Sequence, residues 1–195
     1  MRAFRPFRKA QDGMAAVEFA LLLPVMITLF FGMCETSLAL LCRADVSVMA
    51  STASDLIAQE STTQTSDLSN VYSAAGTVLF PYYNPSASGS QAPTIRITSI
   101  DYDTTTNSTT EGKVGWTCTQ SGSGSLNPAT RSAGQTVSLP QAIMTSNGSV
   151  IMAEVAYSYA SPTSKIITGP INMTNVWYTK PRRVLQIPSP TGGCP

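Results

Sequence analysis

The chain has 195 residues, a formal net charge of +1 and only 12% charged residues, so its composition does not favour nucleic-acid binding. It contains no histidine, which removes the commonest general base and the commonest zinc ligand. A strongly apolar stretch near the N-terminus leaves roughly 150 residues beyond it, enough for one domain.

The N-terminal part consists of a basic leader, residues 1–13, followed by an apolar segment. From Met14 to Cys34 the one charged residue is Glu18. A helix of this length spans roughly 30 Å, the hydrocarbon thickness of a bilayer. We therefore predict a transmembrane helix over 14–42, with Glu35 near its outer interface. The positive-inside rule keeps the basic leader in the cytoplasm and sends the C-terminal part outward.

The helix is predicted to continue over 43–60 and to pack there on an exported domain, residues 61–195. Apolar residues recur in this stretch at steps of three and four, as they do along one buried helix face: Val46, Met49, Ala50, Ala53 and Leu56 or Ile57. One long helix, from about Ala15 to Gln59, follows from this pattern. Ser66 or Asp67 is predicted to cap a second, short helix that ends near Gly76.

The remainder reads as about four short antiparallel strands, which predicts an α+β head. In Thr94–Tyr102 the apolar residues change phase, which predicts a bulge near Ser99. Val114, Trp116 and Cys118 alternate, and residues 120–138 form an excursion rich in glycine and serine. The other strands are expected at 151–159 and Asn172–Thr179, with 184–187 as an extension of the last one.

Four cysteines are present, and none belongs to a C-x-x-C pair, so no metal site is expected. Cys34 and Cys42 would lie about 12 Å apart along the helix axis, too far for a disulfide. Cys118 and Cys194 are candidates for a disulfide in an exported domain, either within one chain or between chains.

No set of catalytic residues stands out in the sequence. It has no G-x-S-x-G, no phosphate-binding glycine loop and no H-E-x-x-H. Asp101 and Asp103 are better explained as a solvated turn than as a cation site, and Arg182 with Arg183 as a solvated strand end. A hydrolase that uses Asp101, Asp103 or Glu154 is disfavoured, so we expect no enzyme and no cofactor.

The most specific motif lies at the N-terminal end of the apolar helix. Gly13 is followed by four small or apolar residues, then Glu18 and Phe19, and Pro24 lies further along the segment. This arrangement resembles the class III signal of type IV prepilins. With the following residues it more narrowly resembles the TadE-like family of the Tad (Flp) pilus system, on the matching positions Gly13, Ala16, Val17, Glu18, Phe19, Ala20, Pro24, Gly32 and Glu35. Met14, where the family often has a small residue, is a departure, as are the apolar residues at 33 and 34.

The resemblance implies a minor pilin or pseudopilin that a prepilin peptidase cuts between Gly13 and Met14. It implies assembly, initiation or tip functions, with a major Flp-type pilin, other minor pilins, an inner-membrane assembly platform and the lipid bilayer as partners. Glu18 would then be an assembly and recognition residue together with Phe19, because a carboxylate in an apolar helix bundle needs a charged partner such as the new ammonium group of a neighbouring subunit. Pro24 predicts a helix kink.

A second hypothesis belongs to another class. The chain would be a periplasmic binding protein with an unprocessed membrane anchor, and the loops around Tyr82, Tyr83 and Trp116 would form its binding surface. The state of the N-terminus distinguishes the two hypotheses.

Overall fold

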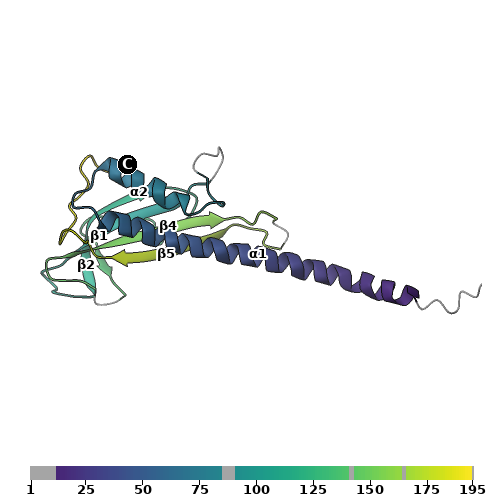
Figure 1. Ribbon diagram of the computed structural model, residues 1–195. Coiled ribbons are helices and arrows are strands. Elements are labelled where there is room, and N and C mark those ends of the chain that lie inside the picture. The colour runs from purple at the N-terminus through teal and green to yellow at the C-terminus, as the bar shows by residue number, and fades with distance from the viewer. Residues whose placement is uncertain (1–11, 85–90, 141–142, 164–165, 195) are drawn as a thin grey trace, which may run out of the picture.

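The computed structural model describes residues 12–84, 91–140, 143–163 and 166–194. A 47-residue helix, α1 (Asp12–Ala58), extends far beyond a head made of one shorter helix and one sheet (Figure 1). The long helix, the short second helix and the antiparallel sheet confirm the predicted α+β class. Most of the predicted basic leader, residues 1–11, lies outside the described residues.

The sheet has five antiparallel strands in the order β3-β2-β1-β4-β5. Their bounds are β1 (Thr94–Tyr102), β2 (Glu111–Gln120), β3 (Thr136–Ser138), β4 (Ser149–Tyr159) and β5 (Ile171–Thr179). The additional strand is β3, whose three residues pair with the start of β2 inside the region predicted as an excursion. Residues 184–187 do not extend β5; they are irregular, and Ile187 is buried.

Helix α2 (Thr65–Thr77) begins slightly earlier than predicted. Its N-cap is Gln64, whereas Ser66 or Asp67 was expected. Asp67 instead occupies the third helical position, where its carboxylate accepts a hydrogen bond of 2.9 Å from the backbone N–H of Gln64. This is the acidic half of a capping box, which satisfies an N–H group that the helix leaves unpaired.

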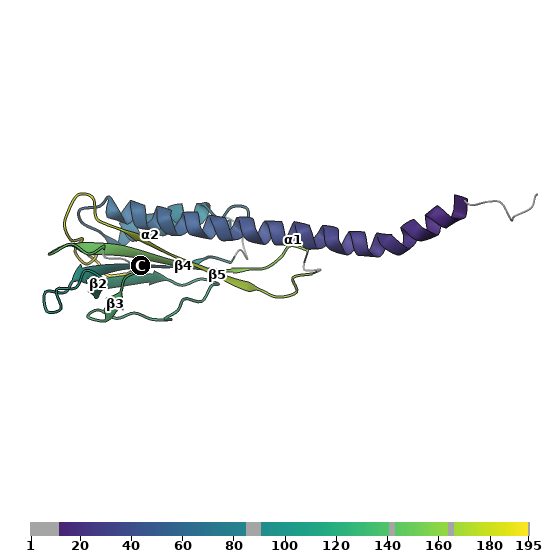
Figure 2. The ribbon, with the colours of Figure 1, turned by 90° about the horizontal axis from the view of Figure 1, so that it is seen from below.

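The two helices cover one face of the sheet, as Figures 1 and 2 show. The core between them includes Met49 and Ala53 of α1, Leu68 of α2 and Ile97 and Val155 of the sheet. A second, smaller apolar cluster lies on the opposite face and contains Ile100, Val114, Val137, Leu139, Met144, Val150 and Met152. Both faces of the central strands are therefore buried.

The predicted bulge near Ser99 is present, and its extra residue lies in the neighbouring strand. Ser99 pairs with Trp116 and Ile100 with Val114, so Gly115 is unpaired in β2. A Cβ atom at Gly115 would lie 2.1 Å from a carboxylate oxygen of Asp101, so a side chain there would force the Asp101 carboxylate to move. The extra residue places Val114 and Trp116 in different clusters although they are two residues apart.

Candidate functional site

Gly13 and Met14 lie in the first turn of α1, and both are exposed. A Cβ atom added to Gly13 would have no other atom within 4 Å. The predicted scissile bond is therefore accessible, and it lies far from the head (Figure 1).

No side chain from Gly13 to Cys34 is buried in the protein. The helix has an 18-residue window with a mean hydropathy of 2.2, and none of that window is buried. It is long and apolar enough to cross a membrane. An apolar surface of this length needs lipid or other apolar partners, which fits a single-pass membrane anchor.

Glu18 and Phe19 both lie on the exposed surface of this segment. Among the described residues, Glu18 forms no ion pair. Phe19 lines a shallow, wholly apolar depression with other residues of the helix, namely Leu23, Met26, Ile27, Phe30 and Phe31. Glu18 is thus a carboxylate beside an apolar helix surface, available to a group outside the described chain.

Pro24 lies inside α1 and cannot donate a helical hydrogen bond. The hydroxyl of Thr28 donates to the carbonyl oxygen of Pro24 at 2.8 Å. Figure 2 shows α1 bending in its N-terminal part. Proline and such a side-chain bond are both known causes of helix bending.

Glu35 is the first buried side chain of α1, with only 1% of its surface exposed. Its Oε2 atom accepts hydrogen bonds from the backbone N–H groups of Ile166, at 3.1 Å, and Ile167, at 2.6 Å. The hydroxyl of Thr163 donates to its Oε1 atom. The carboxylate therefore attaches the connection between β4 and β5 to the helix. Its place near the end of the apolar run was expected, but these contacts were not predicted.

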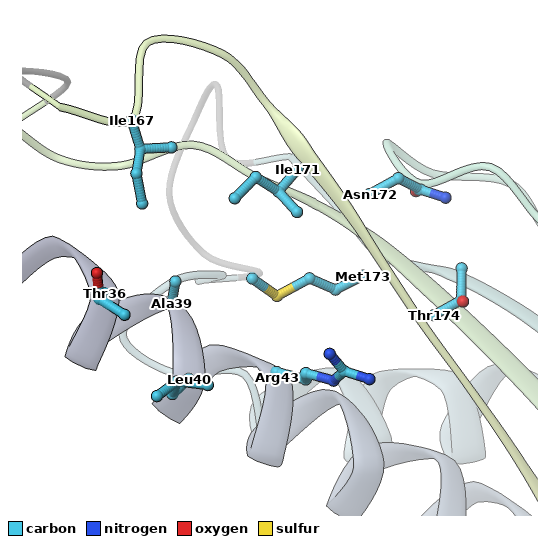
Figure 3. Close-up of a pocket in the computed structure, with 9 residues that line it drawn as sticks. All are labelled: Thr36, Ala39, Leu40, Arg43, Ile167, Ile171, Asn172, Met173 and Thr174. Carbon is cyan, nitrogen blue, oxygen red and sulfur yellow. The ribbon is translucent and has the colours of Figure 1, made fainter.

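A groove runs between α1 and the edge strand β5, directly beyond Glu35 (Figure 3). It is lined by Thr36, Ala39, Leu40, Arg43, Ile167, Ile171, Asn172, Met173 and Thr174. Most of these side chains are apolar or small, and Arg43 is the one charged residue among them. This groove continues the exposed surface of the apolar segment onto the head.

Cys118 and Cys194 form a disulfide within the chain. The same C-terminal region contacts the head through the carbonyl oxygen of Ile187, which accepts a hydrogen bond of 2.9 Å from the Trp116 indole. Thr191 also donates its N–H to the carbonyl oxygen of Thr63 at 3.0 Å. Cys34 and Cys42 are free. The tail is thus held against the far end of the head.

The three residues considered for catalysis do not form one site: Glu154 and Asp103 are in separate ion pairs, and Asp101 accepts a hydrogen bond from Ser99 at 3.1 Å. Glu154 is buried on the sheet face opposite the helices, where it pairs with Arg96 at 2.7 Å and with Arg131 at 2.8 Å. Asp103 pairs with Lys113 at 3.2 Å. Among the described residues there is no group of three or more potential metal ligands.

The basic pair at the end of β5 also has a structural contact. Arg182 pairs with Asp55 at 3.0 Å, with both side chains largely exposed. Its backbone N–H donates to the carbonyl oxygen of Ala58 at 2.8 Å. These two contacts connect the residues after β5 to the end of α1.

The binding surface of the second hypothesis is mostly packed into the head. Trp116 is buried in the core between the helices and the sheet. Tyr82 and Tyr83 are half-buried, and the Tyr82 hydroxyl donates to the carbonyl oxygen of Leu38 at 3.0 Å. Of these aromatic side chains, Tyr82 connects the head to α1 by a hydrogen bond.

Comparison with known proteins agrees with the N-terminal motif. No curated protein and no solved structure matches the chain. A family model described as TadE-like protein matches residues 13–55, from Gly13 to a point near the end of α1. This match confirms the resemblance predicted from the motif: over residues 13–55, the chain is similar to the TadE-like family.

Proposed function

We propose that this chain is a minor pilin or pseudopilin of a bacterial Tad pilus or a related secretion system. It is made as a single-pass inner-membrane precursor with its head in the periplasm, and a prepilin peptidase cuts it between Gly13 and Met14. The mature chain then acts in pilus assembly, in initiation or at the tip. The proposal gives it no catalytic role.

The observation that carries the proposal lies at the N-terminal end of α1. The family match begins at Gly13, the residue predicted to precede the cut. Gly13 and Met14 are exposed, and an apolar helix surface without a buried side chain follows them. Such a surface supports a segment that is first held by lipid and then transferred to other apolar helices in a filament.

After the cut, Met14 would carry a free ammonium group and Glu18 would be the fifth residue. An unpaired carboxylate costs a few kcal/mol in an apolar helix bundle, as estimated from insertion scales. The ammonium group of a neighbouring subunit would remove this cost and fix the axial register between the two helices. The exposure of Glu18 supports its availability for such a contact.

The first experiment determines the N-terminus by mass spectrometry after expression with and without a prepilin peptidase. We expect a mature chain that begins at Met14, and only when the peptidase is present. Gly13→Val should block the cut without disturbing the fold, because no atom lies within 4 Å of an added Cβ. Gly32→Ala is the matched control, since its added Cβ also meets nothing within 4 Å.

An intact leader in the presence of the peptidase would contradict the proposal and leave the anchored binding protein as the better hypothesis. Glu18→Ala separates processing from assembly. We expect its cut to proceed while pili, or the incorporation of this subunit, are lost. Normal assembly of Glu18→Ala would remove Glu18 from the proposed contact.

A further inference from the structure

The described parts of the connection between β4 and β5, residues 160–163 and 166–170, lie near α1 on the side of the apolar segment (Figure 1). Its residue Ile166 is 47% exposed. The Ile166 side chain lines a hollow whose other described lining residues all belong to α1: Thr28, Leu29, Gly32, Met33, Thr36 and Ser37. Part of the head therefore lies beside the last turns of the segment that is apolar enough to cross a membrane.

The position of the contact along α1 determines its depth in the bilayer. If the hydrocarbon layer ends near Cys34, the lining residues from Thr28 to Met33 lie from about 9 to about 1.5 Å inside that boundary, at 1.5 Å per residue. Thr36 and Ser37 lie about 3 and about 4.5 Å outside it. Leu38, which accepts the Tyr82 hydrogen bond, lies about 6 Å outside it. The headgroup layer is about 5–8 Å thick on each side. Ile166 is thus level with the edge of the hydrocarbon, and Tyr82 with the headgroups, where aromatic residues are enriched.

Backbone groups near hydrocarbon need partners within the protein, because lipid chains cannot accept or donate hydrogen bonds. Glu35 meets this need at Ile166 and Ile167, whose N–H groups both donate to one of its carboxylate oxygens. Thr163 donates its hydroxyl to the other oxygen.

From this geometry we propose that Ile166, in the described part of the β4–β5 connection, is a lipid-contact residue that inserts into the hydrocarbon of the leaflet on the head side. Glu35 is the positioning residue, because it holds the backbone of Ile166 and Ile167 against α1. The ligand is the acyl region of a phospholipid bilayer. The head would then have a fixed orientation at the membrane surface. The inference requires the membrane anchor but not processing at Gly13.

The test uses the full chain in phosphatidylethanolamine–phosphatidylglycerol nanodiscs, with Cys34→Ala as the background. Three separate variants carry one new cysteine each for an environment-sensitive fluorophore: Ile166→Cys, Leu185→Cys and Leu22→Cys. Leu185 is the matched control, because it is an exposed apolar residue of the head at the other end of β4. Leu22 reports the anchor. The background protein, whose remaining free cysteine, Cys42, is buried, should take up no label.

We expect a quencher on the lipid acyl chains to reduce the signal at 166 at least threefold more than at 185. Aqueous iodide should show the opposite order. If the 166 probe behaves as the 185 probe while the 22 probe is quenched by lipid, the lipid contact is overturned and the pilin proposal is unaffected. If the 22 probe is not quenched by lipid either, the anchor itself is contradicted, and both proposals fail.

The role of Glu35 is tested by adding Glu35→Leu to the Ile166→Cys variant. Leucine fills similar space but accepts no hydrogen bond, so lipid quenching at 166 should fall toward the value at 185. Glu35→Gln keeps one carbonyl acceptor and should restore part of the quenching. Unchanged tryptophan emission, to which the buried Trp116 and the exposed Trp177 both contribute, would show that the head remains folded. Equal quenching in all three proteins would remove Glu35 from the positioning role.

Discussion

The two halves of α1 form one regular helix in two different environments. From Gly13 to Cys34 the helix is apolar on all sides, and none of its side chains is buried. From Glu35 onward it has one buried face, composed of Glu35, Cys42, Val46, Met49, Ala50, Ala53, Ser54, Ile57 and Ala58. The first half therefore depends on partners outside the chain, and the second half depends on the head. Variants that act on one half alone test this comparison.

Loss of the disulfide should have the largest effect, and it should be confined to the second half and the head. Cys118 and Cys194 close a loop with a sequence separation of 76. The chain-entropy model assigns such a crosslink about 4.5 kcal/mol of unfolding free energy. In a Cys118→Ala, Cys194→Ala variant in nanodiscs, backbone amides of 35–58 should exchange hydrogen much faster by mass spectrometry. Amides of 13–34 should remain protected by lipid.

Cys34→Ala is the control for this variant, because Cys34 is exposed and unpaired. It should change the exchange of neither half. Equal acceleration in both halves of the double variant would show that the apolar half also depends on the head, against the comparison.

Glu154→Gln should have the next largest effect. It should lower the free energy of unfolding by about 3–5 kcal/mol at pH 7, the usual cost of removing one partner from a buried ion pair. Burial by itself raises the pKa of Glu154, but hydrogen bonds from Arg131 and Arg96 outweigh it and leave the pKa below its ordinary value of 4.5. A lowered pKa in the folded state means that this stabilisation is present above pH 4.5 and is lost as the pH falls further.

The measurement is the denaturation midpoint of both proteins from pH 7 down to pH 3. The difference between wild type and Glu154→Gln should be constant near neutral pH and should shrink below about pH 4.5. Asp103, whose pKa is also lowered by its hydrogen bond from the Thr105 backbone, titrates in both proteins and cancels in the difference. If the difference between the two denaturation midpoints grew as the pH fell, the pKa of Glu154 would not be lowered in the folded protein.

A pair of methionine substitutions compares the two halves directly. Met49 is 0% exposed and Met26 is 61% exposed, on the same helix. Met49→Ala should lower the unfolding free energy of the head by about 3 kcal/mol, since it removes buried apolar volume. Met26→Ala should change it by less than about 0.5 kcal/mol. Denaturant titration in lipid, followed by tryptophan fluorescence, measures both, and similar values would contradict the division at Glu35.

The sequence predicted the features that repeat along the chain and missed those that depend on distant contacts. The apolar run and the stripe from Val46 to Ile57 gave the length of α1 to within a few residues. Strand β3 was missed because three residues with one buried side chain are too few to show a period. The opposite orientations of Val114 and Trp116 were missed because strict alternation in β2 conceals the extra residue at Gly115.

The candidate functional site shows the same difference between local patterns, which the sequence predicts, and distant contacts, which it does not. Gly13, Glu18 and Phe19 were found because they form a local motif at a fixed spacing. Glu35 was placed near the outer interface and among the matching positions, but its burial was missed, since its partners lie about 130 residues away in the β4–β5 connection. Its position three residues after Gly32, where the apolar run ends, was the available signal. A charged residue at such a boundary usually faces water, so local reasoning gave no cause to expect burial.

The smallest effect is expected from the ion pair between the end of α1 and the residues after β5. Arg182 and Asp55 lie 3.0 Å apart, but their side chains are 58% and 42% exposed. Exposed pairs contribute about 0.2–1 kcal/mol, because water and salt screen them and two side chains lose freedom. A double-mutant cycle with Arg182→Ala and Asp55→Ala should give a coupling free energy of about 0.5 kcal/mol that disappears in 1 M salt.

The backbone hydrogen bond from Arg182 to Ala58 persists in every variant of the cycle, so the cycle isolates the side chains. A coupling above about 2 kcal/mol would mean that charge, and not only the buried stripe, attaches the second half of α1 to the head.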